Sequence, residues 1–310
     1  MIIFSHRTAL RVYFSNPALG ALPRVGLETK KRVTKKEIDP FREEIALPIC
    51  ADVVVGKASL RGWATPSLSY HTVPEACKED SFVTLGEYGL ASPELCFLQM
   101  ASQLDLIDLV LLGFRLCGDY RPSELRFRTG DLPLTSPKAL SKYVEDHPGC
   151  KGVKRARQAL RYVLAGSNST MESRLTIALI FPPRWGGYGF SFPELNAAIA
   201  GTERKGDLCW LDKRLVVEYD SRLHHETSFA QERDSVRHAE LGFCGFGVIT
   251  VTRAQVEDPL LFDTVASCIA RALGERTRSK SHSCLPCRKQ LQYRLFHCFN
   301  EEELFVGETK

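Results

Sequence analysis

Two acidic residues are spaced so that their side chains can hold a metal ion together. If Asp212 and Lys213 form the turn of a β-hairpin, residues equally distant from that turn face each other, and Asp207 faces Glu218. Facing side chains have Cβ atoms roughly 5 Å apart, where two like charges weaken the hairpin. A divalent cation such as Mg²⁺ would compensate, because hard cations bind carboxylate oxygens. The alternative is an edge hairpin whose acids are simply solvated.

The elements around this hairpin follow one another in an order typical of an α/β sandwich with a mixed sheet. Ser169 is predicted to cap a helix, with Glu172 three residues on in a capping-box pattern. A later helix is expected to stop at Gly242. After the first helix, the predicted order is strand Phe190–Ile199, strand Leu208–Leu211, strand Leu215–Tyr219, helix Phe229–Leu241, strand Gly247–Val251 and helix Leu260–Leu273.

Residues 1–125 are predicted to form a smaller α+β N-terminal domain. Strands are expected within Ile45–Val55 and over Ser81–Leu85. Ser92 and Pro93 predict the start of a helix, as N-cap and first helical residue. A second, almost wholly apolar helix over Leu104–Leu116 should be buried.

Residues 126–165 are predicted to be a helical connector, with a short helix over Lys138–Val144 and a basic helix over Val153–Ala165 that ends at Gly166. Lys154, Arg157 and Arg161 repeat at helical spacing and can bind phosphate, although a solvated face is the alternative. The opposite, apolar side of the basic helix consists of Val153, Ala156, Leu160 and Val163 or Leu164.

The composition, with 44% apolar and 25% charged residues among 310, indicates a globular protein of two domains. The start lacks the pattern of a secretory signal, and no stretch approaches the roughly 20 apolar residues that span a bilayer. We therefore expect a cytoplasmic protein without a membrane partner. The 11 cysteines, an odd number, are interpreted as thiols in a reducing compartment. The net charge of +4 is too small to identify a nucleic-acid partner by itself.

Residues 276–310 form a basic, cysteine-containing tail. It includes the ligand types of a structural Zn²⁺ site, in Cys284, Cys287, His297 and Cys298. The last two residues are adjacent, which is poor spacing for zinc, so free thiols in a flexible tail are the default interpretation.

The acidic residues and their order resemble the PD-(D/E)XK nuclease superfamily, which has a restriction-endonuclease-like fold; here that domain would span residues 166–275. The closer resemblance is to the "domain of unknown function 559" family, related to very-short-patch-repair endonucleases, and covers about a third of the chain. The matching runs are Gly206-Asp207-Leu208, Leu215–Asp220, His224-His225, Glu232-Arg233-Asp234 with Arg237, Leu241-Gly242-Phe243 and Val248–Thr252.

This resemblance implies a metal-dependent endonuclease that hydrolyses phosphodiester bonds of DNA. Asp207 and Glu218 would bind Mg²⁺ or Mn²⁺, with the Tyr219 carbonyl as a third ligand, and Glu172 would orient a metal-bound water. Either His224 or His225 would act near the scissile phosphate. Arg233 and Arg237 either contact phosphate or are neutralised by Asp234 and Glu240.

The chain departs from the superfamily at Asp220, which stands two residues after Glu218, where the superfamily has its catalytic lysine. A carboxylate cannot donate a hydrogen bond to phosphate. Activity would then depend on a histidine or on Arg237. The alternative function is a non-catalytic, antitoxin-like regulator that binds nucleic acid on a degenerate nuclease fold.

A weaker resemblance lies upstream. The run Ala91–Ala101 is similar to a stretch of AbiEi-type abortive-infection antitoxins. It implies a phage-defence or toxin–antitoxin setting. No feature of the sequence identifies a protein partner.

Overall fold

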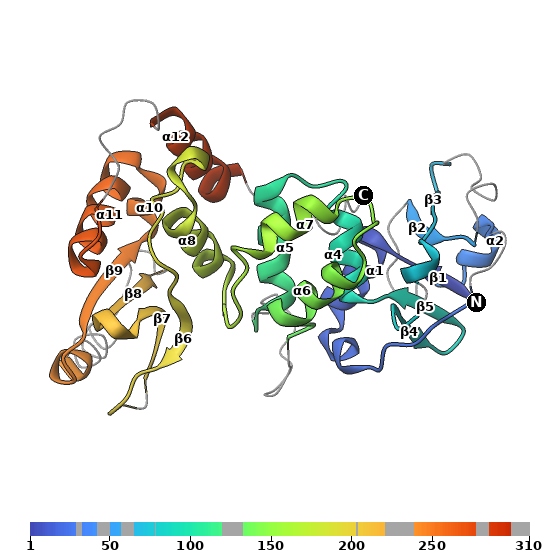
Figure 1. The fold of residues 1–310 in the computed structure, drawn as a ribbon, viewed down its shortest axis with the longest axis horizontal. Coiled ribbons are helices and arrows are strands. Elements are labelled where there is room, and N and C mark those ends of the chain that lie inside the picture. Colours follow the sequence, from blue (N-terminus) through green and yellow to red (C-terminus); the bar gives the residue numbers. More distant parts are fainter. Residues whose placement is uncertain are drawn as a thin grey trace. The chain divides into compact units, whose positions relative to one another are not determined.

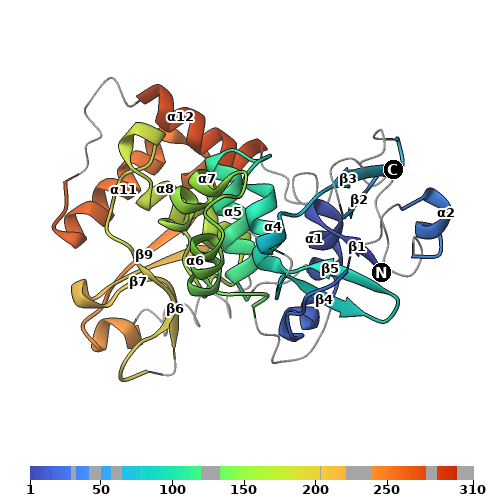
Figure 2. The same cartoon turned by 45° about the vertical axis from the view of Figure 1, so that its right-hand side comes forward.

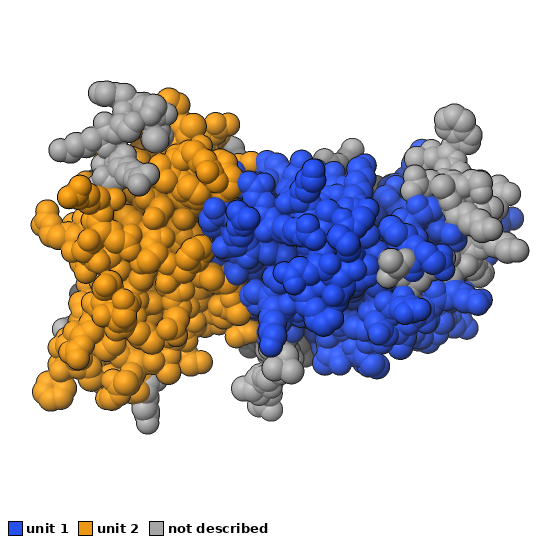
Figure 3. Space-filling view, in the orientation of Figure 1, with its two compact units in different colours: residues 1–118, 123–163, 300–310 blue, residues 119–122, 164–299 orange. Residues whose placement is uncertain are grey.

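The computed structural model shows a mixed α/β protein with two mixed sheets. It describes residues 1–28, 33–41, 50–56, 65–77, 79–119, 133–202, 204–220, 239–276 and 285–298. The described residues divide into two compact units, coloured separately in Figure 3. Unit 1 contains residues 1–118 and 133–163, and unit 2 contains residue 119 and the described residues from 164 onward. Within these residues, no helix is long and apolar enough to cross a membrane.

Unit 1 is built on a five-stranded sheet of short strands in the order β3-β2-β1-β5-β4. Strand β1 is parallel to β5 and antiparallel to β2, β2 is parallel to β3, and β4 is antiparallel to β5. The predicted strand over Ser81–Leu85 is confirmed by β4; of the Ile45–Val55 prediction, residues 45–49 lie outside the described residues. The strands are β1 (Ile2–Phe4), β2 (Ala51–Val54), β3 (Leu68–His71), β4 (Phe82–Leu85) and β5 (Tyr88–Ala91).

The longer helices of unit 1 are α1 and α4 to α7, which Figure 1 labels together with the short α2. The Ser92 hydroxyl accepts a hydrogen bond from the Leu95 N–H and Pro93 occupies the first turn, so the predicted start of α4 is confirmed. Asp105 caps α5, which is buried along most of its length, as its apolar sequence predicts. The helices are α1 (His6–Ser15), α4 (Pro93–Met100), α5 (Leu106–Cys117), α6 (Pro137–Asp146) and α7 (Val153–Leu160); shorter segments are η1 (Pro17–Ala21), α2 (Lys35–Ile38) and η3 (Glu75–Cys77).

Helices α6 and α7, which the sequence places in a connector, pack within unit 1. Helix α6 packs against α4 and α7, and α7 packs against α5. Helix α7 ends at Leu160, so its predicted extension to Ala165 is wrong. Its buried face is Val153, Ala156 and Ala159, whereas the basic residues of this helix are exposed, in agreement with the amphipathic pattern.

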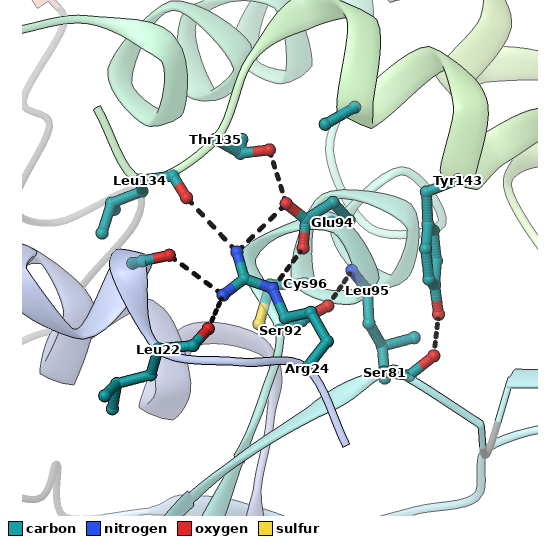
Figure 4. A network of polar contacts seen from close by, with 12 residues as sticks. Leu22, Arg24, Ser81, Ser92, Glu94, Leu95, Cys96, Leu134, Thr135 and Tyr143 are labelled. Atoms are coloured by element: carbon teal, nitrogen blue, oxygen red, sulfur yellow. Dashed lines mark hydrogen bonds and ion pairs between the residues drawn. The ribbon is translucent and has the colours of Figure 1, made fainter. Parts of the chain in front are cut away.

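A partly buried ion pair links the N-terminal segment of unit 1 to α4 and to the segment before α6. Arg24 donates through Nε and Nη2 to the two carboxylate oxygens of Glu94, at 3.2 and 3.3 Å. The Thr135 hydroxyl donates to Glu94 Oε1 at 2.5 Å, and Arg24 also donates to the Leu22 carbonyl at 2.7 Å (Figure 4). Three segments that are distant in sequence therefore meet at one carboxylate.

Unit 2 is built on a four-stranded sheet in the order β6-β7-β8-β9. The pairs β6–β7 and β7–β8 are antiparallel, and β8–β9 is parallel. A parallel pair requires a crossover connection between its strands, and the predicted helix between β8 and β9 lies mostly outside the described residues. The predicted strand Phe190–Ile199 is shorter than expected. The strands are β6 (Glu194–Ala198), β7 (Lys205–Trp210), β8 (Leu215–Asp220) and β9 (Gly247–Thr252).

Helices α8 (Thr170–Ile180), α10 (Arg253–Glu257), α11 (Pro259–Leu273) and α12 (Leu285–Tyr293) belong to unit 2, and Figures 1 and 2 show α8 and α11 beside its sheet. The predicted flexible tail is wrong for residues 285–298, which are helical. Arg288 is 4% exposed, its Nη1 lies 3.0 Å from Asp263 Oδ1, and its guanidinium lies 4.5 Å from the Tyr188 ring centroid. These contacts attach α12 to the core of unit 2.

The helical segment before β9 ends in a Schellman motif rather than at Gly242. The chain is helical through Phe243. The Phe246 N–H donates to the Leu241 carbonyl and the Gly245 N–H to the Gly242 carbonyl, with Gly245 at φ +78°. This pair of bonds defines the motif and requires the left-handed conformation that glycine tolerates. The predicted stop at Gly242 is therefore wrong by one turn.

Candidate metal centre

The hairpin of β7 and β8 has the predicted register but a longer turn. Leu208 pairs with Val217, Cys209 with Val216 and Trp210 with Leu215. The turn is four residues, with a 3₁₀ segment over Leu211–Lys213 and Arg214 at φ +50°. The predicted two-residue turn is wrong, but the register is confirmed because the loop is longer by one residue on each side. The last pair, Leu208 with Val217, directly adjoins Asp207 on β7 and Glu218 on β8.

Strand β7 changes its regular alternation at Asp207. On β6, Leu195 pairs with Leu208 and Ala197 with Gly206, while Asn196, between them, has φ +49°. A Cβ atom at Gly206 would lie 2.5 Å from Val216 Cγ1 and 2.7 Å from Cys209 Sγ. Gly206 therefore faces the same side of the sheet as Cys209, three residues away, although regular strands alternate every residue. Any side chain at this position would collide with β8.

The Asp207 carboxylate takes the place of a backbone acceptor where β7 and β8 stop pairing. Its Oδ2 accepts a hydrogen bond from the Tyr219 N–H at 2.8 Å. The carboxylate thus lies beside the peptide that joins Glu218 to Tyr219.

Glu218 lies on β8, between Val217 and Tyr219, and is 8% exposed. The pKa of the neighbouring Cys209 thiol is raised to about 11. Burial is the largest cause, the charges of Asp207 and Glu218 also raise the pKa, and hydrogen bonds with the backbone of Ala197 and Gly206 lower it. Both carboxylates therefore lie within electrostatic range of one sulfur atom, and that sulfur remains a protonated thiol at neutral pH.

Glu172 lies in the first turn of α8, is 7% exposed and is hydrogen-bonded to a side chain of β6. The Ser169 hydroxyl accepts from the Glu172 N–H at 3.1 Å, which confirms half of the predicted capping box. The Glu172 carboxylate does not complete the box, because its Oε2 accepts from the Asn168 N–H at 2.8 Å and from Asn196 Nδ2 at 2.6 Å. Burial is the largest cause that raises the pKa of Glu172, and the negative charge of Asp207 adds to it against these hydrogen bonds.

Asp207 is the link between the other two acids. It interacts electrostatically with Glu172 on α8, and its carboxylate contacts the peptide that follows Glu218 on β8. Within the part of the chain that the structure describes, no group of three or more His, Cys, Asp or Glu is arranged to hold a metal ion. Mg²⁺ commonly completes a pair of carboxylate ligands with water molecules.

Asn196 is a residue of this site that the sequence analysis missed. Its side chain donates to Glu172 Oε2 and, at 2.8 Å, to the Gly166 carbonyl. Asparagine is disfavoured inside strands and tolerates a positive φ, so its occurrence in the middle of a predicted strand was an available signal.

We expect Asn196→Ala to destabilise unit 2 by about 2–3 kcal/mol, because it removes a hydrogen bond to a buried carboxylate and places a Cβ-bearing residue without a polar side chain at positive φ. Asn196→Gly is the matched control, since glycine accepts this φ. It should lose less stability than the alanine variant. Urea denaturation followed by circular dichroism measures both; equal stability of alanine variant and wild type would contradict the role of Asn196.

One other predicted site residue lies on the same strand as Glu218. Asp220 lies two residues beyond Glu218 on β8 and pairs with Thr252 of β9. The predicted phosphate-binding residues of the basic helix belong to unit 1 and are exposed. They are Lys154 and Arg157 on α7 and Arg161 directly after it. His224, His225, Arg233 and Arg237 lie outside the described residues.

The predicted zinc ligands are only partly described. Cys284 lies outside the described residues, and Cys287 is on α12. The His297 Nε2 lies 3.2 Å from the Glu257 carbonyl oxygen, and its ring stacks on Tyr293. The His297 ring is thus engaged in packing against α10 and α12.

Comparison of the whole chain with protein-family models, with curated proteins and with solved structures found no match.

Proposed function

We propose that unit 2 is a metal-dependent endonuclease that hydrolyses phosphodiester bonds of DNA, with Asp207 and Glu218 as the residues that hold Mg²⁺ or Mn²⁺. The observation that carries this proposal is the Asp207 carboxylate hydrogen-bonded to the Tyr219 N–H where β7 and β8 separate, directly beside the buried Glu218. Two like-charged carboxylates in a buried part of a sheet destabilise the fold unless a cation binds to both of them.

The donor set supports a hard cation. Asp207 and Glu218 offer carboxylate oxygens, while the nearby Cys209 remains protonated and so is a poor ligand for a soft metal. When bound, the metal would lower the pKa of a water and polarise a phosphoryl oxygen. Glu172, held by Asn168 and Asn196, has a fixed carboxylate that can orient such a water. Its raised pKa suits a group that exchanges a proton during hydrolysis.

Asp220 favours a second candidate, a nucleic-acid-binding regulator that does not cleave. It lies on the same strand as Glu218, and its negative charge would repel a phosphate at the place where a lysine would attract one. In this case the exposed basic face of α7 would supply salt-sensitive binding to phosphates without turnover.

The test separates the two candidates. The purified full chain is incubated with supercoiled plasmid, single-stranded DNA and single-stranded RNA, with Mg²⁺, Mn²⁺ or a chelator. The proposal expects nicking or linearisation of DNA that the chelator abolishes. Binding that weakens with salt but never cleaves favours the regulator. Neither binding nor cleavage at low salt would contradict both, and cleavage of RNA alone would overturn the assignment of DNA as substrate.

A further inference from the structure

Unit 1 holds two cysteines whose sulfur atoms are in contact. Cys77 Sγ and Cys150 Sγ lie 3.1 Å apart, although the residues are 73 positions apart in the sequence. Cys77 ends the 3₁₀ segment η3, which follows β3, and Cys150 lies in the turn before α7. Both are free thiols. A disulfide has an S–S length of about 2.05 Å, so a movement of about 1 Å would join them.

Both cysteines line an open cavity, and the half-buried Cys150 is the thiol that a dissolved reagent can reach there. The cavity has a volume of about 630 Å³ and is also lined by His6, His71, Gln99 and Lys151. A position in the cavity wall distinguishes this pair from the other thiols of unit 1 that the core encloses. Those are Cys96 and Cys117, both completely buried and neither part of the cavity wall.

The two thiols differ in exposure, which assigns them different roles. Cys77 is fully buried, and burial together with the hydrogen bond to Cys150 raises the pKa of its thiol to about 12. Cys150 is half-buried at the cavity wall. A thiolate, not a thiol, attacks an oxidant. Cys150 is therefore the attacking residue, and Cys77 is positioned to resolve the product.

We propose that Cys77 and Cys150 form a reversible dithiol–disulfide site whose oxidant is hydrogen peroxide. The Cys150 thiolate attacks one peroxide oxygen, the O–O bond breaks, and the leaving hydroxide takes up a proton as water, which leaves a sulfenic acid. The Cys77 sulfur then attacks the Cys150 sulfur, the S–O bond breaks, and the departing hydroxide takes the Cys77 proton as a second water. Two thiols and one peroxide give one disulfide and two waters.

The disulfide would covalently join the segment after β3 to the turn before α7. Both segments line the same cavity. His71 ends β3, and its imidazole Nε2 lies 2.7 Å from Asp52 Oδ1 and its ring stacks on that of His6 at 3.7 Å. Oxidation would therefore restrain the wall of the cavity that adjoins this histidine pair. This inference is independent of the proposed nuclease activity, which belongs to unit 2.

The test uses the folded full chain treated with hydrogen peroxide, blocked with an alkylating reagent under unfolding conditions, digested and analysed by mass spectrometry. The expected product is a peptide pair linked through Cys77 and Cys150, at least roughly 10-fold more abundant than any other linked pair, and lost on reduction with dithiothreitol. The same treatment in urea is the control and should give scattered pairs, because the contact depends on the fold.

Cys150→Ser tests the order of events without disturbing the fully buried Cys77. In this variant, no link should form and Cys77 should remain unoxidised under conditions that convert the wild type. Two results would overturn the proposal: oxidation of the folded wild type that stops at sulfenic or sulfinic acid on Cys150 without a link, or links distributed among the 11 cysteines as they are in urea.

Discussion

Asp207→Asn should reduce metal-dependent DNA cleavage by at least ~100-fold while unit 2 remains folded. The amide oxygen of asparagine can still accept the hydrogen bond from Tyr219, so the local backbone should be retained. The substitution removes one of the two negative charges that hold the cation, and loss of a group that stabilises developing charge costs ~10²–10³ in rate. Initial rates of plasmid nicking measure the effect.

Asp212→Asn is the matched control for this substitution. It makes the same chemical change in the same hairpin, but Asp212 lies in the turn and its side chain is 75% exposed. We expect the control to cleave at the wild-type rate. If Asp207→Asn also cleaves at that rate, the hydrolysis does not take place at this carboxylate, and the proposed site is wrong even though the protein is a nuclease.

Glu94→Ala should destabilise unit 1 by about 3–5 kcal/mol, because it leaves the Arg24 guanidinium partly buried without its carboxylate. The loss also releases Thr135, the second donor to Glu94. Glu87→Ala, at an exposed acid of the same unit, is the control and should change the free energy of unfolding by less than about 0.5 kcal/mol. Urea denaturation gives both values, and similar losses for the two variants would contradict the role of the ion pair.

The same ion pair predicts how the stability of unit 1 depends on pH. Burial alone would raise the pKa of Glu94, but the hydrogen bonds and charge of Arg24 and the hydroxyl of Thr135 outweigh it and leave that pKa below its ordinary value of 4.5. An acid whose pKa is lowered by folding stabilises the fold above its ordinary pKa. That contribution is lost as the pH falls from about 4.5 through the lowered pKa.

Urea midpoints measured at neutral pH and at several acidic pH values check this prediction. The wild-type midpoint should fall below about pH 4.5, whereas Glu94→Gln should be less stable at neutral pH and should lack this part of the pH dependence. Parallel curves for the two proteins would show that another group causes the acid sensitivity.

Local patterns were sufficient for much of the fold. The starts of α4 and α8 follow from Ser92 and Ser169, because N-cap side chains act on backbone N–H groups only two or three residues away. The register of β7 and β8 was also predicted, because the observed four-residue turn extends the predicted turn by one residue on each side and leaves the pairing unchanged. The end of α7 and the packing of α12 were not predictable, because they depend on contacts with residues far along the chain, such as Asp263.

For the candidate site, counting along the chain was enough to predict that Asp207 and Glu218 lie near each other on neighbouring strands. The directions of the side chains could be read from the folded structure alone: the break in alternation at Asp207, and the hydrogen bond from Asn196 on β6 to Glu172 on α8. The reason is physical. Pairing between adjacent strands repeats with a period that can be counted along the chain, whereas the direction of a side chain at a bend depends on which atoms from other elements leave room for it.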